Sequence, residues 1–161
     1  MAQFIITVFL LAVATIGLVY LLKLHQNPVL FLKIDWWLQI ILLGATLICI
    51  EIGYLAQFPL FNIFAGLLLL GLGFEQWLIS NLICLRFAVI NPKLKTWRQI
   101  YGVVGLFMSV FSIYVFVESS NQPYLEKNLY IFVFALLLIS FFYALVTRQD
   151  LVQRKAQAAK I

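Results

Sequence analysis

Long apolar stretches separated by short polar segments run through almost the whole chain. A helix needs about 20 mostly apolar residues to cross a hydrocarbon core of ~30 Å. Five stretches are long enough when Glu51 is taken as an interruption within the second, namely residues 3–22, 36–57, 60–86, 100–117 and 129–147. The pattern therefore predicts an all-α integral membrane protein, a compact bundle of about five transmembrane helices.

The first stretch has the length of a secretory signal, but it lacks a basic start. We therefore expect it to be a retained helix. The segments between the stretches are too short to form a separate domain: residues 23–35, 58–59, 91–99 and 118–127. We expect one transmembrane domain over residues 1–147, followed by a basic cytoplasmic tail over residues 148–161 that is either helical or frayed.

Two of the connecting segments contain the pattern N-P-x-L, beginning at Asn27 and at Asn91. One interpretation is a duplicated helical hairpin, in which the first two spans repeat as the third and fourth. The simpler interpretation is local, because asparagine caps a helix and proline suits its first position. The pattern alone leaves both open.

Charge changes this picture by adding an orientation. Only 11% of the residues are charged, against about 25% in soluble domains. In a five-span arrangement every lysine and arginine except Lys127 falls on one side, which by the positive-inside rule is the cytoplasm. The N-terminus is then outside and the C-terminus cytoplasmic, in a plasma or inner membrane or an equivalent energy-coupling membrane. The net charge of +5 indicates contact with anionic lipid rather than with nucleic acid.

Two acidic residues, Glu51 and Glu75, lie within apolar stretches. A charged side chain at the centre of a membrane helix costs roughly 2.5–3.5 kcal/mol, so such residues usually have a partner or a function. Straight helices joined at Pro59 would separate the two by ~12 Å in depth. We therefore do not expect them to share a proton directly.

The third span carries the densest group of polar residues. Gly71 and Gly73 offer a helix break just before four polar side chains, namely Glu75, Gln76, Ser80 and Asn81. Broken helices at membrane depth line polar cavities in transporters. One hypothesis is that the four side chains line such a cavity. The alternative is a protonated Glu75 that is hydrogen-bonded to a neighbouring helix.

Small residues recur at helical spacing in the fourth span, at Gly102, Gly105, Ser109 and Ser112. Such stripes let membrane helices approach each other closely. The stripe is either an internal packing face of the bundle or a surface for a protein partner.

Catalytic and metal-binding motifs are missing from the sequence. The single histidine, His25, cannot form a multi-histidine metal site, and no nucleophile motif or phosphate-binding loop is present. The two cysteines, Cys49 and Cys84, are expected to lie too far apart for a disulfide. We expect neither an enzyme nor a bound metal or cofactor.

Two functions fit this description. The favoured expectation is a small accessory, assembly or partner-binding subunit, which packs in the membrane against a protein partner or a second copy of itself. The alternative is a proton-linked transporter or channel for small solutes or ions that uses Glu51 and Glu75.

Overall fold

The fold is a bundle of long helices. The computed structural model describes residues 27–88, 90–122 and 126–160. Within them every regular element is an α-helix: α2 (Pro28–Leu55), α3 (Pro59–Arg86), α4 (Pro92–Asn121) and α5 (Lys127–Ala158). All four are long and apolar enough to cross a membrane, which confirms the prediction of a helical membrane bundle. The span expected over residues 3–22 lies outside the described residues.

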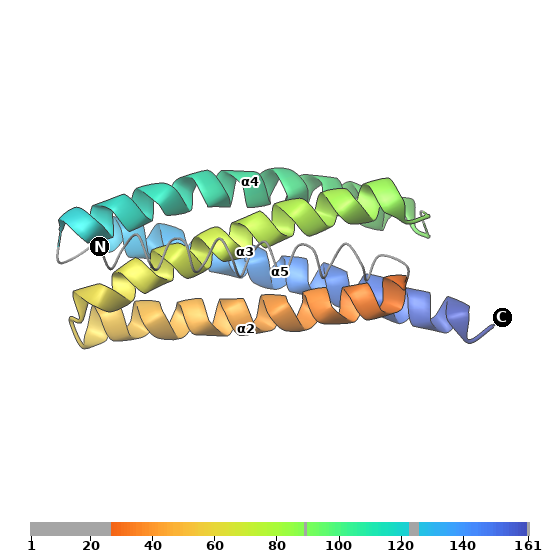
Figure 1. Cartoon of the computed structure of the whole chain (residues 1–161), viewed down its shortest axis with the longest axis horizontal. Coiled ribbons are helices and arrows are strands. Elements are labelled where there is room, and N and C mark those ends of the chain that lie inside the picture. Colours follow the sequence, from red (N-terminus) through yellow and green to blue (C-terminus); the bar gives the residue numbers. More distant parts are fainter. Residues whose placement is uncertain (1–26, 89, 123–125, 161) are drawn as a thin grey trace.

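The four helices run lengthwise side by side, and α3 crosses obliquely between α2 and α4 (Figure 1). The α3–α4 pair packs most extensively, whereas α4 and α5 contact each other little. One end of the bundle carries the start of α2, the end of α3, the start of α4 and the C-terminus of the chain, where α5 reaches furthest (Figure 1). We call this end the C-terminal end.

Two helices begin earlier than the apolar stretches that predicted them. At the start of α2 the Asn27 side chain accepts a hydrogen bond from the Leu30 amide at 3.2 Å, and Pro28 follows in the first turn. At the start of α4 the Asn91 side chain accepts one from the Lys93 amide at 3.0 Å. Both Asn-Pro pairs are therefore helix caps. The segments expected to connect spans at 23–35 and 91–99 are helical from residues 28 and 92 onward.

The helix break that Gly71 and Gly73 offered does not occur, because α3 runs without interruption from Pro59 to Arg86. Gly73 instead allows close approach to α4. A Cβ atom on Gly73 would lie 2.8 Å from the Gly105 carbonyl oxygen, and one on Gly105 would lie 2.6 Å from the Gly73 carbonyl oxygen. The two helices thus meet backbone to backbone at this point, as small residues allow in membrane bundles.

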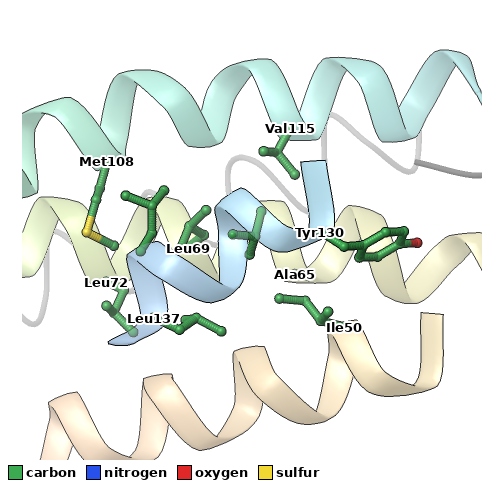
Figure 2. Close-up of a cluster of buried hydrophobic side chains, with 10 residues drawn as sticks. Ile50, Ala65, Leu69, Leu72, Met108, Val115, Tyr130 and Leu137 are labelled. Atoms are coloured by element: carbon green, nitrogen blue, oxygen red, sulfur yellow. The ribbon is translucent and has the colours of Figure 1, made fainter. Parts of the chain in front are cut away.

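Apolar side chains from all four helices fill the half of the bundle away from the C-terminal end. Ile50, Leu69, Met108 and Leu137 point into the space between the helices (Figure 2). A smaller apolar group closes the C-terminal end: Phe31, Leu32, Ile79, Ile83 and Leu151. The polar residues Asp35, Glu75 and Tyr143 lie between these two apolar groups on α2, α3 and α5.

Candidate functional site

A buried arginine stands at the centre of the site. Arg98, six residues after the start of α4, is only 1% exposed. Its Nη1 atom lies 3.6 Å from Oδ2 of Asp35 on α2, and its Nη2 atom lies 3.6 Å from Oδ2 of Asp150 on α5. The guanidinium therefore links three helices, about 9 Å along α4 from its first residue.

Hydroxyl groups of α5 complete the surroundings of the Asp35 carboxylate. Arg98 Nη1 donates a hydrogen bond to the Tyr143 hydroxyl at 2.9 Å, and this hydroxyl donates to Asp35 Oδ2 at 3.4 Å. Thr147 Oγ1 donates to the same oxygen at 3.0 Å. The Arg98 guanidinium also lies 5.1 Å from the centre of the Tyr143 ring, within the range of a cation–π contact. Asp35 is thereby fixed by two helices.

Glu75 of α3 adds a second carboxyl beside Asp35. It is 7% exposed and lies beside the Asp35 carboxyl. Neither Glu75 oxygen receives a hydrogen bond from any donor in the part of the chain that the structure describes. A hydrogen bond between two carboxyls requires a proton on one of them, because ionised carboxylates only accept. We call Asp35, Glu75, Arg98, Tyr143 and Asp150 the buried charged cluster.

Amide side chains continue the polar layer away from the C-terminal end. Gln76 Nε2 donates to Gln39 Oε1 across α2 and α3 at 3.5 Å, and both side chains are fully buried. The Gln76 Oε1 atom has no partner among the described residues. Ser80, one turn further along α3, is also buried. The Gln76 Oε1 atom can therefore still accept a hydrogen bond.

A second arginine closes the site towards the C-terminal end. Arg154 Nε donates to Asp150 Oδ1 at 3.0 Å, and Arg154 Nη2 donates to the Ala88 carbonyl at 3.2 Å. Its guanidinium also lies 5.4 Å from the centre of the Phe87 ring. Arg154 thus ties α5 to the segment that follows α3, and Asp150 stands between two arginines.

The residues expected to line a cavity divide into two groups. Glu75, Gln76 and Ser80 are buried and face neighbouring helices. Asn81 is exposed, and its side chain donates to the Trp77 carbonyl of its own helix at 2.7 Å. Glu51 is also exposed and lies near the other end of α2, so the fold does not bring it to Glu75.

The small-residue stripe of α4 lies inside the bundle. Gly102, Gly105 and Ser112 are buried, and Ser109 is half-buried. Gly105 meets the backbone of α3, and a Cβ atom on Gly102 would contact Ser80 at 3.5 Å. The stripe therefore packs against α3 within the same chain.

Four members of the cluster were not expected as site residues: Asp35, Arg98, Tyr143 and Asp150. Sequence patterns placed them in connections, in the tail or at the headgroup level, because they lie near the ends of apolar stretches. A local signal does exist. Asp35 and Gln39 are four residues apart on α2, and Tyr143, Thr147 and Asp150 share one face of α5 at helical spacing. No local signal in the sequence shows that these faces of α2 and α5 pack against each other.

The arrangement is suited to holding a proton rather than a metal. Among residues 27–88, 90–122 and 126–160, no group of three or more histidine, cysteine or acidic side chains could hold a metal ion. Cys49 and Cys84 are free thiols. With Asp35 and Glu75 both ionised, Arg98 balances only one of them. One shared proton makes Asp35, Glu75 and Arg98 together neutral, while Asp150 is also paired with Arg154.

Comparison of the chain with protein-family models, curated proteins and solved structures finds no match.

Proposed function

We propose that this protein is a proton-linked membrane transporter or channel for a small solute or ion, and that the buried charged cluster loads and releases the proton. The observation that carries this proposal is the contact between Asp35 and Glu75 beside a single fully buried arginine. Breaking the balance of such a buried group costs about 3–5 kcal/mol. A proton that arrives or leaves therefore changes the energy of the helix packing.

This energy cost gives the cluster a means to drive conformational change. The four charged residues of the cluster come from four different helices, namely Asp35, Glu75, Arg98 and Asp150. Protonation of the cluster therefore changes the electrostatic interactions among all four described helices. A ligand that binds one of two packing arrangements better shifts the population towards it, and a proton is such a ligand. Transport would couple the proton to a solute that is exposed on alternate sides of the membrane.

The topology proposed for this function has five spans, with the N-terminus outside and the C-terminus in the cytoplasm. It is supported by the charges at the two ends of the described helices. Lysines and arginines gather at the C-terminal end, whereas the other end carries Glu118 and Glu126 beside Lys127. The positive-inside rule then puts the C-terminal end in the cytoplasm of a plasma, inner or equivalent energy-coupling membrane. Apolar side chains exposed around the bundle fit contact with lipid, as at Ile41, Val103 and Leu138.

The test is proton flux into liposomes that contain the purified protein, followed with an enclosed pH-sensitive dye and driven by a potassium diffusion potential. We expect Glu75→Gln to reduce the flux about tenfold or more, which is at least ~1.4 kcal/mol in the barrier. The matched control is Glu51→Gln, which removes an exposed glutamate of the neighbouring helix and should leave the flux unchanged. Equal loss in both variants would contradict a specific role for Glu75.

An accessory or assembly role is the second proposal. Its support is an opening between α4 and α5, which contact each other little. This opening holds a cavity of about 250 Å³ lined in part by Phe111, Tyr114 and Phe132. A partner helix or a second copy would fill such a lateral opening. The same liposomes separate the two proposals: a wild-type protein that conducts no protons above empty liposomes favours the accessory role.

A further inference from the structure

A small pocket joins the C-terminal end of the bundle to the buried charged cluster. Its polar and ionisable lining residues are Cys84, Asn91, Lys95, Arg98, Asp150 and Arg154. Its volume is about 30 Å³, and it is partly open to the outside. One water needs roughly 10–15 Å³ by this measure, so the pocket has room for about two.

The pocket reaches polar groups that the protein itself does not satisfy. Arg98 Nε and Nη2 donate no hydrogen bond to any acceptor of the described residues, although Arg98 is almost completely buried. Buried N–H groups without acceptors are commonly met by water. Water in this pocket would therefore touch both Arg98 and the Asp150 carboxylate.

The other half of the described bundle is packed mainly with apolar side chains, with Thr46, Asn62, Ser112 and Ser140 buried among them. The large apolar group that includes Ile50, Leu69, Leu72 and Met108 fills that half of the bundle. Apolar packing of this kind holds no water. The two ends of the described bundle thus differ in their access to Asp35 and Glu75.

We infer that protons reach the buried charged cluster from the C-terminal side, through this pocket, and that Asp150 relays them. This inference rests on the proposed function and identifies the access route and the relay residue of the same site. Asp150 is a relay residue because it stands at the inner wall of the pocket, 3.6 Å from Arg98, which in turn lies 3.6 Å from Asp35.

The relay moves one proton and changes no other bond. Water in the pocket takes up a proton from the solvent at the C-terminal end and passes one to an Asp150 oxygen. Water beside Arg98 accepts this proton from Asp150 and passes one to Asp35, where it is shared with Glu75. Arg98 remains protonated throughout, since a guanidinium does not lose its proton in proteins, and it serves to orient the water. Each described helix contributes charged groups that face this route: Asp35 from α2, Glu75 from α3, Lys95 and Arg98 from α4, and Asp150 and Arg154 from α5.

The native cysteines allow a direct test of the route. Cys84 lines the pocket, whereas Cys49 packs against the apolar group in the other half of the bundle. A Cys49→Ala protein leaves Cys84 as the only thiol, and a Cys84→Ala protein leaves Cys49. Each is treated with a small methanethiosulfonate reagent. The carbonyl stretch of the protonated carboxyl is then followed by infrared spectroscopy after transfer into heavy water.

We expect modified Cys84 to slow hydrogen–deuterium exchange of this carboxyl about tenfold, and modified Cys49 to leave it unchanged. Exchange that is unaffected by modified Cys84 would overturn the inference. The assignment of the band is checked with Glu75→Gln, which should remove it. A protein with no such band would instead overturn the proposed proton site, so the two failures are distinguishable.

The relay role of Asp150 is tested in the same assay without any label. We expect Asp150→Asn to slow the exchange about tenfold, whereas Glu118→Gln, at the cavity of the opposite end, should not change it. Asp150→Glu restores the carboxyl and should restore the rate, which a purely structural role would not require. An unchanged rate in Asp150→Asn would remove Asp150 from the route.

Discussion

At the scale of single residues, the cluster depends on Arg98. It is the only arginine in contact with both Asp35 and Asp150 among the described residues, and it donates to the Tyr143 hydroxyl at 2.9 Å as well. A buried ion pair adds little stability compared with an apolar pair of the same shape, but the loss of one partner leaves a charge uncompensated. The main consequence of losing Arg98 would therefore be that the buried carboxylates of Asp35 and Asp150 lose their shared cation.

We expect Arg98→Met to destabilise the protein by about 3–5 kcal/mol, because Asp35 and Asp150 lose their shared partner. The measurement is unfolding by titration with a denaturing detergent. The double variant Arg98→Met with Asp35→Asn should recover part of the loss, since one uncompensated carboxylate is removed. A double variant less stable than either single variant would contradict this account.

At the scale of helices, the glycines have different roles that their positions in the sequence do not reveal. Gly73 and Gly105 form the closest contact that any glycine makes between α3 and α4, whereas a Cβ atom on Gly71 would meet no described residue within 4 Å. The sequence suggested a helix break at Gly71 and Gly73 and a packing stripe at Gly105. Tertiary structure joins two of these features, because the partner of Gly105 is Gly73.

This difference predicts opposite effects of the same substitution. Gly105→Ala should destabilise the protein by about 1–3 kcal/mol, because its methyl group meets the α3 backbone. Gly71→Ala should leave the stability unchanged or raise it by up to ~1 kcal/mol, since alanine favours a helix over glycine. Thermal unfolding of the two variants in the same detergent checks the prediction. Equal losses would show that close packing is not what distinguishes Gly105.

At the scale of the whole molecule, the buried charged residues of the described helices all lie towards one end. The buried charged cluster and the pocket lie near the C-terminal end, and the larger apolar group fills the other half. The basic residues that set the proposed orientation lie at the same end. The proton site would therefore communicate with the cytoplasm.

The orientation predicts which side of the membrane reaches each thiol. In inside-out vesicles a membrane-impermeant thiol reagent should label Cys84, which lines the pocket at the C-terminal end. Right-side-out vesicles should leave it unlabelled, with Cys49→Ala protein used throughout so that Cys84 is the only thiol. Labelling of Cys84 from the outside would reverse the proposed threading.

The sequence by itself determined that the chain forms long apolar helices and roughly where the four described helices lie. Apolar stretches of sufficient length require helices in lipid, because every backbone polar group must be satisfied within its own segment. Asn27 and Asn91 with their following prolines fix two helix starts by local hydrogen bonds. Glu75 was identified as unusual because an acidic residue in an apolar stretch needs no structure to be noticed.

Only the tertiary structure decided which polar residues meet. Arg98 and Asp35 are 63 positions apart, and Arg98 and Asp150 are 52 apart, so their contacts follow from how helix faces pack and not from any local pattern. The same reason explains why Glu51 does not join Glu75: both interrupt apolar stretches, but Glu51 lies on an exposed face of α2. Helical periodicity shows which residues share a face, whereas packing decides what each face meets.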